Sequence, residues 1–176
     1  MLGKTYDGQD CGLARALEVV GERWTLLIVR DAFYGVERFG DFAARLDIPR
    51  AVLSQRLRSL VDEGLMERLD DPGHAGRPRY RLTADGRALW PALHALMRWG
   101  ADRAGDGGPA RSHRHARCGS ELQPGGACPA CGLVPPPQDV ETERTDPARG
   151  RDDLVSRALS APRRLLQPLE LGAPST

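Results

Sequence analysis

The sequence has no long apolar run and little net charge. Its 176 residues carry 25 Lys and Arg against 24 Asp and Glu, for a formal net charge of +1. No stretch of about 18 apolar residues is present, so we expect no membrane-spanning helix. The first residues have neither an apolar core nor a cleavage pattern, and we therefore expect no secretion signal and a cytoplasmic protein. A net charge near zero does not by itself indicate nucleic-acid binding. The distribution of charge along the sequence is more informative than the total.

Signatures of catalysis are also missing. The sequence contains no recognisable nucleophile–base pair, no glycine-rich phosphate loop and no open metal site. A deaminase-type catalytic zinc site combines Pro-Cys-x-x-Cys with an upstream His-x-Glu, and no such upstream element is present. We therefore do not expect an enzyme.

The most informative stretch runs from Phe39 to Leu82. Two short helices joined by a tight turn are expected first, the second beginning at Pro49, because apolar residues recur at helical spacing on one face of each. Gly64 is expected to end the second helix. Two short strands at 65–69 and 79–82 flank a segment dense in turn formers and predict a hairpin. This order predicts a mainly α fold with a small β-hairpin (α+β), a winged helix-turn-helix.

Helices are also expected on both sides of this stretch. One begins after Asp10 and ends near Gly21, a second reaches about Tyr34, and a long one follows Thr83 and is kinked at Pro91. The last helix has an apolar face larger than a small domain needs for its core. Its apolar residues are Leu89, Leu93, Leu96, Met97 and Trp99. We favour pairing with a partner chain over simple coverage of the core.

Arginines are concentrated where a winged helix would meet DNA. Between positions 38 and 58 the sequence has five arginines and two aspartates, and the hairpin contributes further arginines. On charge alone, a solvated surface explains this equally well. A recognition helix, however, presents its N-terminal residues to base edges, where Arg pairs with guanine and Gln with adenine. The residues expected at DNA are Arg50, Ala51, Ser54, Gln55 and Arg58 on the helix and Arg77 and Arg79 on the hairpin. Arg58 is assigned to a phosphate or sugar, and Arg56 to a structural ion pair.

Three of the four cysteines lie close together in the C-terminal part. His115-x-x-Cys118-Gly and Cys128-x-x-Cys131-Gly are two knuckles of the same form. Four thiolate and imidazole ligands leave no open position, so they predict one structural zinc ion per chain in a zinc-ribbon-like unit. Three alternatives remain. His113 could replace His115, the thiols could lie unpaired in a flexible tail, or Cys128 and Cys131 could form a redox pair.

The predicted layout has four parts. Residues 1–10 form an arm, 11–105 the winged-helix domain and 111–134 the Cys/His unit. Residues 135–176 begin with three prolines and are expected to form a linker and a tail that is disordered or partly helical.

Taken in order, these motifs resemble the HxlR-type winged helix-turn-helix transcription regulators of bacteria. The matching stretches are Cys11–Leu17, Gly21–Ile28, Arg38–Phe42, Leu53–Leu57, Gly64–Arg68 and Tyr80–Gly86. The resemblance covers roughly residues 11–105 and departs at Gly12, where the family often has proline. It implies a homodimer paired through its first and last helices, with one wing per subunit beside an inverted-repeat operator in double-stranded DNA.

Cys11 is expected at or near the first position of the first helix. There the helix dipole, and Arg15 one turn on, would favour the thiolate. Some members of the family that this chain resembles use such a cysteine to sense oxidants or electrophiles. A small buried apolar side chain at the dimer interface is the alternative.

A DNA-binding transcription regulator is the leading interpretation. The alternative is a protein-interaction adaptor that uses the winged helix and the zinc unit as docking surfaces. The polar residues Arg50, Ser54 and Gln55 favour DNA, because an adaptor would present aromatic side chains there.

Overall fold

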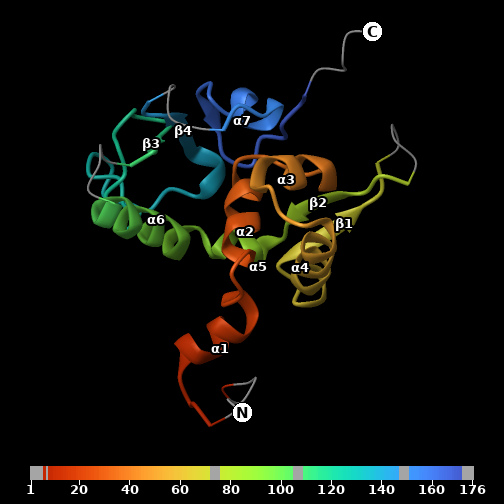
Figure 1. Cartoon of the computed structure of the whole chain (residues 1–176). Helices are drawn as coiled ribbons and strands as arrows, with labels where there is room; N and C mark the ends of the chain where they lie inside the picture. Colours follow the sequence, from red (N-terminus) through yellow and green to blue (C-terminus); the bar gives the residue numbers. More distant parts are fainter. Residues whose placement is uncertain (1–5, 7, 72–75, 105–108, 147–150, 172–176) are drawn as a thin grey trace, which may run out of the picture.

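The computed structural model describes residues 6, 8–71, 76–104, 109–146 and 151–171. Helix α1 (Gly12–Val20) extends away from the body, and α2 (Thr25–Phe33) runs through its centre (Figure 1). Of the residues of α1, only Ala14 is buried. A nine-residue helix with so little packing is not stable by itself in water, so α1 requires a partner surface.

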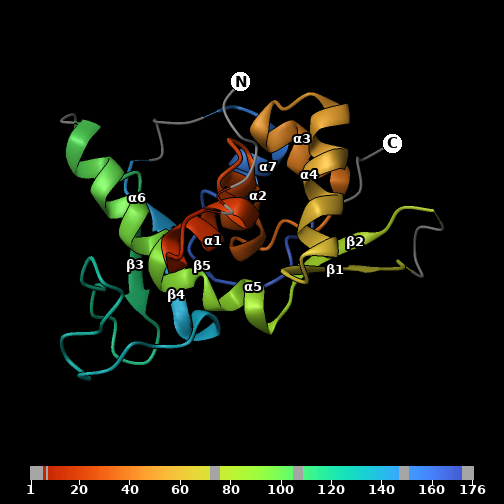
Figure 2. The same ribbon diagram turned by 90° about the horizontal axis from the view of Figure 1, so that it is seen from below.

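The predicted helix-turn-helix is formed by α3 (Phe39–Leu46) and α4 (Arg50–Asp62). Asp47 ends α3 in the left-handed conformation, with φ 53°, and Pro49 is the N-cap of α4 instead of its first helical residue. Strands β1 (Met66–Leu69) and β2 (Arg79–Leu82) pair antiparallel beside α4 and form the predicted hairpin (Figure 2). The mainly α winged-helix class with its small hairpin is therefore confirmed.

The helix predicted after Thr83 is divided in two. The Thr83 hydroxyl accepts a hydrogen bond from the Gly86 N–H and caps α5 (Ala84–Ala88), and α6 (Trp90–Ala104) begins after a break at Leu89. Pro91 lies in the first turn of α6, where its missing N–H costs nothing. It therefore starts a new helix instead of kinking a continuous one.

The C-terminal part forms a second sheet that the sequence analysis did not predict. Strands β3 (Arg111–His115), β4 (Val140–Arg144) and β5 (Arg163–Arg164) pair antiparallel in the order β3-β4-β5. A 3-10 turn, η1 (Pro137–Asp139), precedes β4, and helix α7 (Leu154–Ala158) precedes β5. After residue 134, where a linker and a disordered or partly helical tail were expected, the described residues contain the helix α7 together with strands β4 and β5.

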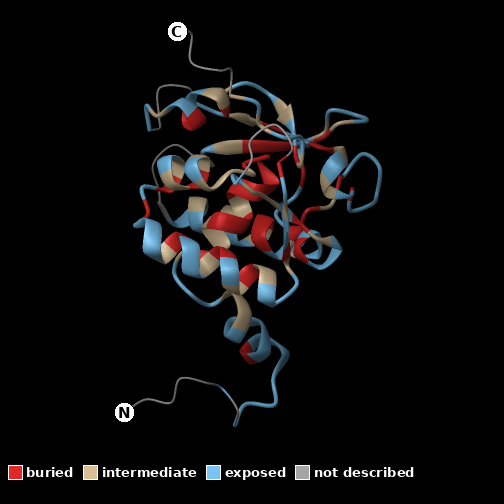
Figure 3. Cartoon of the chain, turned by 90° about the vertical axis from the view of Figure 1, so that its right-hand side faces the viewer, coloured by how far each residue is buried: buried red, intermediate tan, exposed pale blue. Residues whose placement is uncertain are grey.

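This part folds because it shares the core of the winged helix. Its buried apolar residues are Leu122, Val140, Val155, Leu159 and Leu165. They join one cluster with Phe33, Phe42 and Trp90. Buried residues are concentrated in the middle of the molecule (Figure 3). These C-terminal residues are buried as members of the cluster that also contains residues of α2, α3 and α6. Within the described residues, no helix is long and apolar enough to cross a membrane.

Candidate nucleic-acid interface and metal centre

Helix α4 has one buried face and one polar exposed face. Leu53, Leu57 and Leu60 point into the core. The residues predicted to contact bases or phosphates, Arg50, Ala51, Ser54, Gln55 and Arg58, are all exposed on the other face. The Arg50 guanidinium lies 5.3 Å from the centre of the Phe39 ring, so a cation–π contact with α3 orients it. Near the apolar face, Arg56 pairs with Glu22 at 3.5 Å, as predicted.

A surface hollow of about 380 Å³ lies between α4 and the hairpin. Its lining consists of Ser54, Arg58, Val61, Arg68 and Tyr80. Arg68 and Tyr80 are partners in the strand register, so their side chains lie on the same face of the hairpin. Two guanidinium groups beside a hydroxyl and a phenol are suited to a phosphate. Arg68 and Tyr80 are not among the residues predicted to contact DNA, although the alternation of side chains along the two strands could have indicated them.

The arginines of the wing have different surroundings. Arg77 is exposed beside residues 72–75, which lie outside the described part of the chain. Arg79 is held by Asp71 (3.3 Å) and Glu37 (3.4 Å), and the hydrogen bond to Asp71 raises its pKa further. Its guanidinium therefore ties the hairpin to the segment before α3, and its contact with DNA stays a prediction.

The four predicted metal ligands meet at one point. The nitrogen or sulfur atoms of His115, Cys118, Cys128 and Cys131 all lie within 4.8 Å of one another. The Cys118 Sγ is 3.4 Å from that of Cys128 and 3.6 Å from that of Cys131. Four ligands at tetrahedral zinc, with Zn–S of about 2.3 Å, place sulfurs roughly 3.8 Å apart. The arrangement can therefore hold one zinc ion with little movement.

Local backbone geometry builds this centre. In the first knuckle the Gly119 N–H donates to the His115 carbonyl at 2.8 Å, and in the second the Gly132 N–H donates to the Cys128 carbonyl at 2.9 Å. Both glycines have positive φ, 74° and 67°, which completes each tight turn. His115 and Cys128 are buried, whereas Cys118 and Cys131 are exposed.

The thiols of the centre differ in their pKa values. Backbone and side-chain hydrogen bonds from Ser120 lower the pKa of Cys118 to about 6. The hydrogen bond that the Cys131 thiol donates to Cys118 raises the pKa of Cys131 to about 11, because it stabilises the protonated form. A bound cation favours the thiolate form of its ligands and would allow both to ionise.

His113 does not belong to the metal centre. Its ring packs 5.2 Å from that of Trp90 and 5.0 Å from that of His94, between centroids. Burial lowers its pKa to about 3, so the ring stays neutral. Of the two candidate histidines, the structure brings only His115 to the cysteines.

Cys11 is the exposed N-cap of α1. The backbone N–H groups of Ala14 and then Leu13 lower the pKa of its thiol. Arg15, expected to help, pairs instead with Asp10 at 2.5 Å. The backbone N–H groups at the start of α1 therefore account for the lowered pKa of Cys11.

Comparisons with known proteins agree with this architecture. The family described as HxlR-like helix-turn-helix matches residues 19–106. An uncharacterized HTH-type transcriptional regulator of Mycobacterium tuberculosis is 47% identical over 132 residues, which covers 74% of this chain and 82% of that protein. The uncharacterized HTH-type transcriptional regulator YvaP of Bacillus subtilis is 35% identical over 89 residues, or 50% of this chain and 82% of the relative.

Solved structures agree as well. The crystal structure of PA1607, described as a candidate transcription factor, superposes with a TM-score of 0.52 at 43% identity. The match covers 55% of this chain and 68% of that one. The family match over half of the chain and the relative of 47% identity together show that this chain belongs to the HxlR-like helix-turn-helix family.

Proposed function

We propose that the protein is a transcription regulator that binds a specific operator in double-stranded DNA as a homodimer. The observation that supports this best is the exposed polar face of α4, backed by a rigid core and flanked by the hairpin. Recognition helices of this kind place such a face in the major groove. The face carries no aromatic side chain, which an adaptor surface would be expected to have.

The residues proposed to contact DNA bases lie in the first half of α4. Arg50, Ala51, Ser54 and Gln55 would reach base edges, with Arg50 on guanine and Gln55 on adenine. Arg58 and Arg68 would hold one backbone phosphate in the hollow between α4 and the hairpin. Arg77 would contact the minor groove or flanking phosphates from the wing.

The dimer would form through α1 and α6. Leu13 and Leu17 on α1 are 67% and 40% exposed, and Leu96 and Trp99 on α6 are 50% and 62% exposed. Large apolar side chains exposed on two helices are typical of an interface. A second copy would also supply the packing that α1 lacks.

Zinc would be structural. His115, Cys118, Cys128 and Cys131 would complete a four-coordinate site with no position open for substrate. The protein would therefore carry one zinc ion per chain for its fold, without catalytic chemistry.

The test is binding to duplex DNA selected from a random pool. A regulator of this kind enriches an inverted repeat, and its affinity falls steeply with salt as counterions are released. If no sequence is enriched and binding does not depend on salt, the proposal is wrong and the adaptor becomes the better explanation.

A further inference from the structure

The Cys/His unit contacts α6 directly. The Glu121 carboxylate, in the loop between the two knuckles, pairs with Arg98 of α6 at 3.5 Å. In the same loop the Pro124 carbonyl accepts a hydrogen bond from His94 Nδ1 at 3.2 Å. The metal ligands Cys118 and Cys128 bracket this loop, so a bound ion would hold its two ends together. The loop lies on the opposite side of the molecule from the wing (Figures 1 and 2).

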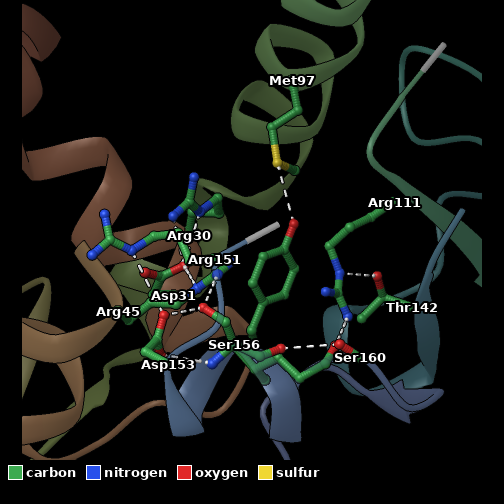
Figure 4. A network of polar contacts seen from close by, with 12 residues as sticks. Arg30, Asp31, Arg45, Met97, Arg111, Thr142, Arg151, Asp153, Ser156 and Ser160 are labelled. Atoms are coloured by element: carbon green, nitrogen blue, oxygen red, sulfur yellow. Dashed lines mark hydrogen bonds and ion pairs between the residues drawn. The ribbon is translucent and has the colours of Figure 1, made fainter. Parts of the chain in front are cut away.

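The end of the chain contacts the helix-turn-helix. Arg45 of α3 donates to the Ser156 Oγ of α7 at 2.6 Å and also approaches the buried Asp31 of α2, with 3.8 Å between Nε and Oδ1 (Figure 4). Arg151 lies 3.5 Å from the carboxylate of Asp47, the left-handed residue between α3 and α4. The residues before and in α7 therefore contact the turn that orients the recognition helix.

Backbone hydrogen bonds fasten the same segment to α2. The Leu166 N–H donates to the Phe33 carbonyl at 2.7 Å, and the Leu169 N–H donates to the Gly35 carbonyl at 2.8 Å. The approach is close enough that a Cβ on Gly35 would meet the Gln167 carbonyl oxygen at 1.8 Å. The segment is thus packed against the winged helix as tightly as an element of its own core.

One short sheet connects the metal centre to these contacts. His115 is the last residue of β3 and pairs with Val140, the first residue of β4. The Val140 carbonyl in turn accepts a hydrogen bond from the Leu165 N–H at 2.9 Å. His115, on β3, is therefore separated by the single strand β4 from the segment around Leu165, which contacts α2.

The Cys/His unit has little else to hold it. Among residues 116–134 the buried apolar side chains are Leu122 and Cys128, and Leu133 and Val134 are about half exposed. So small an apolar core does not keep a loop ordered, whereas metal binding supplies folding free energy directly. Loss of the ion would release the loop and with it the contacts to α6.

We propose that the metal centre controls DNA binding, because residues 109–146 and 151–171 form a brace between α6 and the helix-turn-helix whose attachment to α6 depends on bound zinc. This inference rests on the proposed function and adds a regulatory role to the metal centre. With zinc the brace fixes α3 and α4 relative to α6, through which two chains would pair. Without zinc the two recognition helices lose their fixed spacing, and operator affinity falls.

The test compares full-length protein loaded with zinc, stripped by a chelator and reloaded with zinc. Hydrogen exchange of the backbone amides is followed in α3, in α6 and in residues 111–134, together with operator affinity. We expect stripping to speed exchange in all three regions and to weaken operator binding roughly tenfold or more, with both effects reversed by zinc. Faster exchange confined to residues 111–134, with unchanged affinity, would overturn the proposal.

Variants separate the metal centre from the other thiol. Cys131→Ser removes an exposed ligand and should behave like stripped protein, whereas Cys11→Ser should respond to zinc like the wild type. Circular dichroism identifies any variant that fails to fold. If neither the loaded nor the stripped form binds DNA, the proposed function fails, while the exchange in α3 and α6 still decides whether the brace exists.

Discussion

Arg45 donates a hydrogen bond to the Oγ of Ser156 over 2.6 Å and so joins α3 to α7 across 111 positions of sequence. The same guanidinium approaches Asp31, which is fully buried and also pairs with Arg30 at 2.8 Å. Ser156 in turn lies beside Asp153, the N-cap of α7. One polar network thus connects the central helix, the helix-turn-helix and the end of the chain, and it makes the C-terminal part a component of the DNA-binding unit.

Arg50→Ala and Gln55→Ala should weaken operator binding selectively. Each removes a base contact expected to contribute about 1–3 kcal/mol, with a much smaller loss on random DNA. Equilibrium titrations on both DNAs measure the difference. Equal losses would place these side chains on phosphates instead.

Arg68→Ala should weaken binding to every DNA sequence alike. A lost phosphate contact also lowers the slope of log affinity against log salt by about one. Arg164→Ala, which removes an exposed arginine from β5 on another surface, is the matched control and should leave the slope unchanged. An unaltered slope for Arg68→Ala would show that the hollow beside α4 holds no phosphate.

Leu13→Glu and Leu96→Glu should convert the dimer to monomers, because each buries a charge in the proposed interface. Light scattering gives the mass, and the affinity for an inverted repeat should fall with it. Leu154→Glu on α7 alters a side chain of similar exposure, 66%, outside that interface and should leave the dimer intact. A wild-type monomer at micromolar concentration that binds a half-site with full affinity would contradict the assignment.

The purified protein should contain about one zinc ion per chain. His115→Ala should lose it, because that ring completes the ligand set, whereas His113→Phe should retain it, because His113 packs between aromatic rings. Elemental analysis of both variants measures this. Zinc retained by His115→Ala and lost from His113→Phe would reverse the assignment.

Cys11 should react with electrophiles faster than an ordinary thiol at neutral pH. Its pKa is lowered, so the alkylation rate should rise with pH through a midpoint below the usual range for cysteine. A quinone should weaken DNA binding by the wild type and leave Cys11→Ser unaffected. If both respond equally, the thiols of the metal centre are the reactive ones.

Local signals in the sequence determined the winged helix and the grouping of His115 with Cys118, Cys128 and Cys131. Apolar residues three and four apart predicted α3 and α4, turn formers between alternating strands predicted the hairpin, and Thr83 marked the start of α5. Knuckle spacing identified the cysteines because their geometry depends on neighbours within a few residues. In each case the residues that interact lie close together in the sequence.

Tertiary structure alone decided how residues 135–146 and 151–171 pack, which histidine lies beside the cysteines and which carboxylates Arg79 contacts. Val140, Leu159 and Leu165 are buried because they join one apolar cluster with residues of α2 and α3, such as Phe33 and Phe42. Arg79 pairs with Glu37, which lies 42 positions away in the sequence. Contacts between residues so distant in sequence depend on how whole helices and strands pack together. A local sequence pattern therefore does not predict them.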